Sequence, residues 1–450
     1  MESLLQIPLP ARQAIVFVVG LLLGKAVNWA IYRRSYSKWA IGPWCAAPRS
    51  CNRSWHHWLP IVGWFFMRAE GGVDDDHSRG FWVRPLLLEL SLGLGLVLLY
   101  RWEISGAMLP SAAAPFADRL QTMLHLQFAA HGLLFTFLVA ASFIDFDEQA
   151  IPDSITIPGT LIALIAGTFI PLMRLPEMTP QGTLSVLNLT SPNGWAAELH
   201  GVRGLGIAIF CFGGWCLALL PKITTTQFGW WRGFLLMIAS MVRPPRRTER
   251  MVSSKRPFRR DHRSIIWLIG VQWLGWIWIL AAWWLCNSAQ WQCLLSQLFG
   301  MAVGGTMIWS IRIVGKLALG REAMGFGDVT LMAMIGAFIG WQPCVIIFAL
   351  APASAVAVAL LQLLMTRNTE IAFGPYLALG TIMTAVAWRW LWFGYARVYF
   401  EIGEGWFVPG VGIVCLVLMG GMLWMIRLFK EVVLGVEDDG ENGALAEPEA

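Results

Sequence analysis

The chain has little charge. Only 14% of its 450 residues are Asp, Glu, Lys or Arg, whereas 57% are hydrophobic. Its mean hydropathy of +0.59 excludes an ordinary soluble enzyme, because a water-facing surface needs many more charged side chains. The composition predicts instead a protein with many membrane-spanning helices.

Several patterns of catalysis and ligand binding are also missing. The chain contains no glycine-rich phosphate loop, no His-Glu-x-x-His helix and no Ser/His/Asp order. Only two of its eight cysteines, Cys45 and Cys51, lie in a polar loop, and Cys-x5-Cys is not a usual zinc-ligand spacing. We therefore expect neither a disulfide framework nor a metal site. If zinc were bound, Cys45 and Cys51 would be the candidate ligands.

Apolar segments long enough to cross a ~30 Å hydrocarbon core recur along the whole chain. They cover residues 12–32, 85–101, 123–144, 154–173, 202–220, 265–286, 298–317, 330–350, 351–365, 375–395 and 409–427. The first keeps polar residues inside it and lacks a small-residue cleavage site, so we expect a span and not a removed signal peptide. The sequence predicts an all-α, polytopic integral membrane protein with about eleven transmembrane helices.

Basic residues gather in two loops, 33–84 and 221–264, whereas loops 174–201 and 287–297 carry few or none. Because Lys and Arg stay on the cytoplasmic side, both basic loops should be cytoplasmic and the N-terminus should face outward. The run at 243–263 is expected to touch anionic lipid and not nucleic acid, since no nucleic-acid-binding module accompanies it. The acidic tail after residue 427 is expected to be disordered.

Two aspartates stand at the ends of apolar segments. Asp145 ends the third predicted span and Asp328 opens the eighth, and counting the crossings places both at the cytoplasmic face. Carboxylates are costly beside a membrane core and are usually functional there. Two neighbouring carboxylates would share one proton, so that one could activate a water and the other protonate a leaving amine. Because helix C-termini are partly negative and N-termini partly positive, we expect Asp145 to hold the shared proton and Asp328 to be ionised.

A structural interpretation stands beside this one. Asp328 could be the N-cap of its helix, and Asp153, which follows Pro152, could cap the fourth span. Asp147 is expected to face water. In the catalytic interpretation, Gly325 and Gly327 remove side chains where a substrate backbone must approach.

Three motifs then follow one another along the chain: Phe143-Ile144-Asp145 with residues 151–158, residues 320–328 with Gly340-Trp341-Gln342, and residues 373–380 (Phe-Gly-Pro-Tyr-Leu-Ala-Leu-Gly). Together they resemble the bacterial type IV prepilin peptidases, the GxGD membrane aspartic proteases. The resemblance implies that Asp145 and Asp328 are the catalytic pair. The residues that it assigns to substrate binding or support are Gly325, Gly327, Asp153, Gly374 and Pro375.

The family resemblance also implies a substrate and a location. The expected activity is cleavage of the basic leader of prepilins or of type II secretion pseudopilins, at the cytoplasmic face of the bacterial inner membrane. The expected partners are these precursors and the lipid bilayer, with no nucleic acid, and proteolysis should need no cofactor. The alternatives are an inactive relative that acts as an assembly factor and a proton-coupled transporter.

The N-terminal loop departs from the family pattern. Many members carry two CxxC pairs there and methylate the new N-terminus with S-adenosylmethionine. Here Cys45 and Cys51 stand at wider spacing, and Gly71-Gly72-Val73-Asp74-Asp75-Asp76 replaces the second pair. Zinc is therefore not expected, and methyl transfer with S-adenosylmethionine stays open. Thr330 also stands where the family usually has Lys, and Ala372 replaces a common proline.

Five parts are expected along the chain. Residues 1–122 hold the first two spans and the cytoplasmic loop, which resembles the methyltransferase-associated N-terminal domain of the family. Residues 123–173 and 298–395 form the two halves of the peptidase domain. Residues 174–297 are an insertion with two spans and the second basic loop, and residues 396–450 add a last span and the acidic tail.

Overall fold

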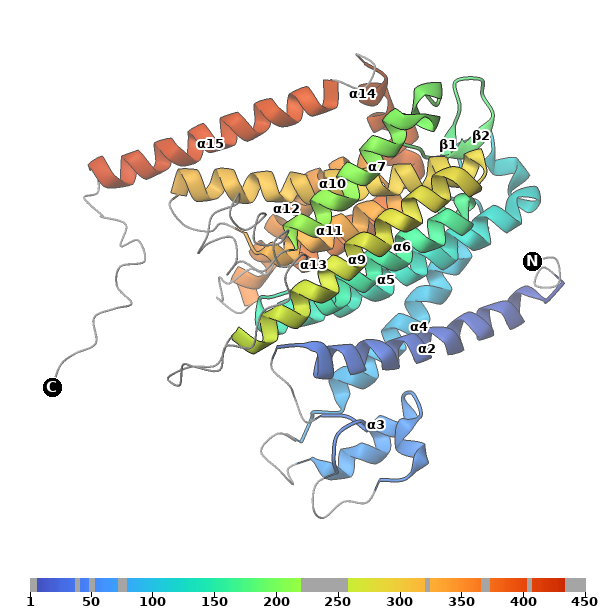
Figure 1. Ribbon diagram of the computed structural model, residues 1–450. Coiled ribbons are helices and arrows are strands. Elements are labelled where there is room, and N and C mark those ends of the chain that lie inside the picture. The colour runs from blue at the N-terminus through green and yellow to red at the C-terminus, as the bar shows by residue number, and fades with distance from the viewer. Residues whose placement is uncertain are drawn as a thin grey trace, which may run out of the picture. The chain divides into compact units, whose positions relative to one another are not determined.

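The computed structural model describes residues 6–36, 41–47, 53–71, 79–219, 258–319, 324–365, 373–402 and 407–433. These residues form two compact units, one made of residues 1–196 and 292–450 and the other of residues 197–291 (Figure 1). The smaller unit lies inside the segment 174–297 that the sequence analysis treats as an insertion.

Helices account for almost all of the regular structure. The long and medium helices are α2 (Leu9–Arg34), α4 (Val83–Ile104), α5 (Gln121–Glu148), α6 (Asp153–Phe169), α7 (Val202–Ala218), α9 (Phe258–Leu285), α10 (Ser288–Leu319), α11 (Phe326–Ile339), α12 (Trp341–Met365), α13 (Gly374–Val386) and α15 (Phe407–Val433). Short helical pieces are η1 (Trp55–Trp58), α3 (Val62–Met67), η2 (Arg68–Glu70), η3 (Ala114–Leu120), η4 (Pro171–Met173), η5 (Ala197–His200), the π-helical η6 (Arg389–Ala396) and α14 (Arg397–Glu401).

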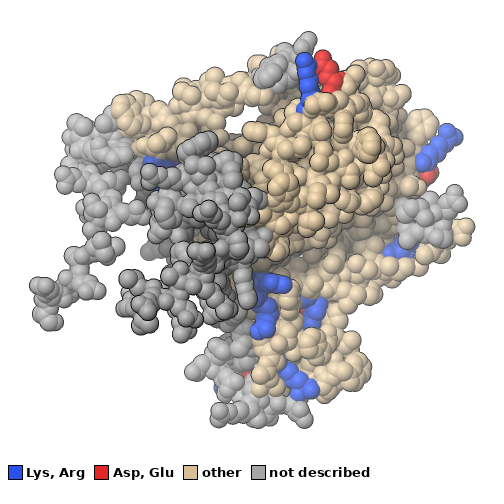
Figure 2. Space-filling view, viewed as in Figure 1, with Lys and Arg blue, Asp and Glu red and all other residues tan. Residues whose placement is uncertain are grey.

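The prediction of an all-α polytopic membrane protein is confirmed. Six described helices are long and apolar enough to cross a membrane, and five shorter apolar helices complete the set of eleven predicted segments. Within the described residues, most of the face in Figure 2 carries neither acids nor bases, which suits helices that face lipid.

One predicted boundary is wrong. The break between the eighth and ninth spans lies at Gly340 and not at residue 350, so that α11 is short and α12 long. Gly340 has a φ of +98°, a conformation that side chains disfavour, and α11 ends there. Hydropathy could not locate this break, because residues on both sides of it are equally apolar.

Close helix packing brings together the ends that carry the aspartates. In the larger unit α6 packs against α11, α13 packs against α5 and α12, and α2 packs against α4. At one crossing a Cβ on Gly20 would lie 2.7 Å from the Cα of Gly93, so the backbones of α2 and α4 touch. The ends of α5, α11 and α13 consequently meet in one region.

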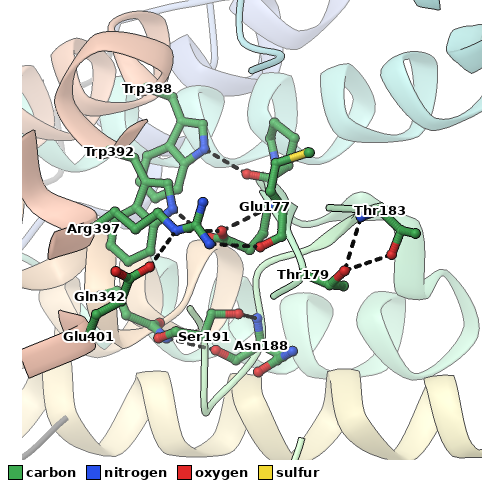
Figure 3. Close-up of polar contacts among 12 residues, drawn as sticks. Glu177, Thr179, Thr183, Asn188, Ser191, Gln342, Trp388, Trp392, Arg397 and Glu401 are labelled. Carbon is green, nitrogen blue, oxygen red and sulfur yellow. Dashed lines mark hydrogen bonds and ion pairs between the residues drawn. The ribbon is translucent and has the colours of Figure 1, made fainter. Parts of the chain in front are cut away.

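A small hairpin, which the sequence analysis did not predict, lies at the opposite ends of these helices. β1 (Pro176–Met178) pairs antiparallel with β2 (Leu184–Val186). The Trp388 indole donates to the Pro176 carbonyl at 2.9 Å, and the Trp392 indole donates to the Glu177 carboxylate (Figure 3). The segment that follows α13 thus holds the hairpin in place.

Glu177 is the charged centre of this contact. The Arg397 Nε lies 3.6 Å from its carboxylate, and Arg397 also donates to the Met178 carbonyl at 3.2 Å (Figure 3). Burial raises the pKa of Glu177 to about 7, and the hydrogen bonds and Arg397 only partly oppose that rise. Burial therefore favours the protonated form of this carboxyl group.

The smaller unit consists mainly of α7 and α9, which pack against each other. The indoles of Trp283 and Trp291 donate to the carbonyls of His200 and Leu199, each at 2.8 Å, and so fix η5 against the helix ends.

Candidate active site

Asp145 and Asp328 lie together at one end of the larger unit. Asp145 is in the last turn of α5, and Asp328 is the third residue of α11. Their side chains are only 5% and 7% exposed, and the two carboxyl groups lie near enough to repel each other electrostatically. The fold thus places side by side two carboxyl groups that are 183 positions apart in sequence.

The backbone of α13 holds Asp145. The Gly374 N–H donates to Oδ2 of Asp145 at 2.9 Å. Gly374 is the first residue of α13, so the partially positive N-terminus of that helix faces the carboxylate. Pro375 follows in the first turn, where a missing N–H costs little.

Gly374 has no room for a side chain. A Cβ at this position would lie 2.6 Å from Oδ2 of Asp145 and 2.9 Å from Cδ1 of Ile151. Only the family motif predicted a supporting role for Gly374, and this hydrogen bond was not foreseen. In the sequence, the Phe-Gly-Pro segment is the signal of this role. Only the fold shows that Gly374 contacts Asp145.

Asp328 does not act as the N-cap that the structural interpretation proposed. The N-cap of α11 is Gly325, whose N–H donates to the Asp328 carboxylate, as in the second half of a capping box. Among the described residues, Oδ1 of Asp328 is buried without a hydrogen-bond partner. One oxygen of this carboxyl group therefore remains able to hold a proton or to contact a substrate.

The two glycines of the Gly-Phe-Gly-Asp motif differ in their surroundings. Gly325 is exposed, and the atom nearest to the position of its missing Cβ is Oδ2 of Asp328, at 3.5 Å. At Gly327 a Cβ would lie 2.8 Å from Cβ of Ile151 and 3.0 Å from its backbone nitrogen. The expectation of open space for a substrate thus fits Gly325, whereas Gly327 is needed for packing against the α5–α6 connection.

The neighbouring acids take other roles. Asp153 is exposed and is the first residue of α6, but the N-cap is Pro152 and no side chain caps this helix, so the predicted capping role of Asp153 is wrong. Asp147 is exposed, as predicted, and it also accepts two hydrogen bonds from Arg84, at 2.8 and 2.9 Å. This ion pair links the start of α4 to the end of α5 beside Asp145.

Thr330 fills the position where the family usually has a lysine. Its hydroxyl donates to the Gly327 carbonyl at 3.0 Å, and the side chain is buried. No cation therefore enters the site from this position.

An ion pair organises the N-terminal loop. Arg53 donates to the Glu70 carboxylate at 2.7 and 2.5 Å and to the carbonyls of Gly42 and Cys45 at 2.8 and 2.6 Å. Cys51 lies outside the described residues. Within the described part of the chain, no group of three or more His, Cys, Asp or Glu side chains is placed to hold a metal ion.

The fold and the site define a class: a multi-pass helical membrane protein with a buried pair of carboxylates at one end of its helices. Residues 266–361, which include Asp328, match the model of the type IV leader peptidase family. This match begins inside the segment 174–297. The resemblance drawn from the motifs is thereby confirmed.

Known proteins named prepilin leader peptidase/N-methyltransferase are similar to part of the chain. The one from Pseudomonas aeruginosa is 42% identical over 88 residues, which are 18% of this chain and 29% of that protein. The one from Escherichia coli (strain K12) is 32% identical over 96 residues, which are 21% of this chain and 43% of that protein. The chain thus aligns with less than half of the length of these relatives. No solved structure matches it.

Proposed function

We propose that the chain is a membrane aspartic endopeptidase that cleaves the leader peptide of type IV prepilin-like or pseudopilin precursors. The observation that carries this proposal is the buried pair of Asp145 and Asp328, with the Gly374 N–H on Asp145. The family match and the names of the relatives support the substrate class.

The two carboxyl groups have different roles in the proposed reaction. Two buried carboxylates side by side ionise together only at high cost, so the pair shares one proton. The position of Asp145 at the end of α5 predicted the protonated member, but the Gly374 N–H and the N-terminus of α13 stabilise a negative charge there. Asp145 is therefore proposed as the ionised member. It removes a proton from the attacking water.

Asp328 is the protonated member. Its unpartnered Oδ1 donates the proton to the scissile carbonyl oxygen as the water attacks. When the resulting gem-diol collapses, Asp145 passes the proton that it took from the water to the leaving amine, and Asp328 takes back a proton from a gem-diol hydroxyl. The Gly325 N–H on the same carboxyl group fixes its orientation. Exposed Gly325 offers an approach for the substrate backbone.

The proposed location is the bacterial inner membrane, with the aspartate pair at the cytoplasmic face. The basic loops 33–84 and 221–264 support this orientation through the positive-inside rule. The leader of the precursor would then reach the pair from the cytoplasm. Proteolysis is proposed to need no cofactor, and methylation by S-adenosylmethionine stays an open second activity.

The test incubates the detergent-purified protein with a prepilin and S-adenosylmethionine and determines the N-terminal mass of the product. We expect a shortened product with wild type and none with Asp145→Asn or Asp328→Asn. Asp147→Asn is the matched control, because it removes a neighbouring carboxylate that pairs with Arg84, and it should retain cleavage. Full activity in either variant of the pair would refute the proposal, and a mass increase of one methyl group would reveal the second activity.

A further inference from the structure

The lobe between α2 and α4 carries an apolar face that the peptidase proposal does not use. On α3, Val62, Phe65 and Phe66 are 44%, 49% and 51% exposed, whereas Trp64 and Met67 are fully buried. The exposed residues follow the i, i+3, i+4 spacing of one helix face. Trp55 and Trp58 of η1 are 75% and 57% exposed. These five exposed side chains are called the α3 face below.

The buried side of α3 is fixed to the membrane helices. The Trp64 indole donates to Oε1 of Glu89 at 2.7 Å, and the Ile61 N–H donates to Oε2 at 2.6 Å. Nζ of Lys25 lies 3.7 Å from the same carboxylate and 4.6 Å from the centre of the Trp64 ring. Asn28 donates a further hydrogen bond to Glu89. The lobe is therefore held against α2 and α4.

This attachment sets the depth of the lobe. Glu89 lies six residues inside the start of α4 and Lys25 nine residues inside the end of α2, which is about 9 and about 14 Å along the helices at 1.5 Å per residue. A bilayer has a hydrocarbon core of ~30 Å and measures about 40–45 Å with its headgroups. Since α2 and α4 are long enough to cross such a bilayer, this attachment puts α3 within reach of the boundary between headgroups and acyl chains. Figure 1 shows α3 near the ends of these two helices.

We propose that the α3 face lies in the lipid leaflet and makes this lobe an interfacial membrane anchor. At this depth the half-exposed aromatic rings meet lipid and not water, and removing apolar surface from water is favourable. Tryptophan is also the residue type that favours the membrane interface. The occupant of the face is the bilayer in which the protein itself sits, and the inference does not depend on the peptidase proposal.

The anchor adjoins the active site. α4 begins at Val83, and its second residue, Arg84, holds Asp147 two positions from Asp145. A lobe fixed in the leaflet therefore fixes the start of α4, and with it the contact between Arg84 and Asp147, relative to the membrane surface.

The test places an environment-sensitive fluorescent amino acid at position 66 of the full chain in lipid nanodiscs. Doxyl groups at defined depths on the lipid chains and aqueous iodide serve as quenchers. The same probe at Leu94, exposed in the middle of α4, reports the acyl region, and at Glu198, exposed in η5, it reports water. Position 62, on the same helix face, serves as an independent second probe site.

We expect blue-shifted emission at position 66, strongest quenching by the shallow doxyl groups and less iodide quenching than at position 198. A depth of about 5–10 Å below the headgroup boundary is typical of interfacial helices. Iodide quenching as strong as at position 198, without doxyl quenching, would overturn the proposal. The proposal would also be overturned if the probe were protected from iodide only when a prepilin is present, or increasingly at higher protein concentration. The α3 face would then be covered by the substrate or by a second copy of the chain.

Discussion

Replacement of Gly374 by alanine tests the site most directly. The added Cβ would lie 2.6 Å from Oδ2 of Asp145 and 2.9 Å from Cδ1 of Ile151, distances at which atoms must move. The Asp145 carboxylate would be displaced and lose the 2.9 Å hydrogen bond from the Gly374 N–H. A hydrogen bond to a charged group contributes about 1.5–3 kcal/mol, which corresponds to a roughly 10- to 150-fold loss in kcat/KM.

The assay follows the rate of prepilin cleavage by the N-terminal mass of the product. Gly394→Ala is the matched control, because a Cβ on Gly394 meets no atom within 4 Å. Its rate should equal that of wild type. The thermal midpoint of Gly374→Ala in detergent should show that the variant is folded. If folded Gly374→Ala cleaved within about twofold of wild type, the role of the α13 N-terminus would be refuted.

Further predictions concern pH, the ion pairs and metal. Because the pKa of Glu177 rises from 4.5 to about 7 on folding, the protonated side chain is favoured in the native state, and ionisation costs about 3 kcal/mol of stability. This stability is present below pH 4.5 and is lost as the pH rises to 7. Glu177→Gln should therefore raise the thermal midpoint at pH 8 and have little effect at pH 4.5. An equal change at both pH values would contradict a raised pKa for Glu177. Glu70→Gln should speed trypsin cleavage of the N-terminal loop, since it breaks the buried ion pair with Arg53; unchanged cleavage would show that this pair does not organise the loop. The more exposed pair of Arg84 and Asp147 should show a coupling of at most about 1 kcal/mol in a double-mutant cycle on thermal stability. EDTA should leave the cleavage rate unchanged, and inactivation that zinc reverses would disprove metal-free catalysis.

The sequence predicts much of this architecture, because membrane spans follow from the length and hydropathy of local segments. The helical class and the eleven apolar segments were foreseen in this way. The break at Gly340 was not, since it depends on one backbone conformation within a uniformly apolar stretch. The β1–β2 hairpin was also missed, because indoles and a guanidinium from residues 388–397 stabilise it across more than 200 positions.

For the site, the sequence by itself predicted Asp145 and Asp328 and, from the parity of the crossings, one common face for both, since these two predictions need only residue type and hydropathy. Only the tertiary structure decided what surrounds them. The hydrogen bond from Gly374 to Asp145, the packing of Gly327 on Ile151 and the attachment of α3 to Glu89 each join distant segments. Such contacts depend on how the helices pack, which local composition does not encode.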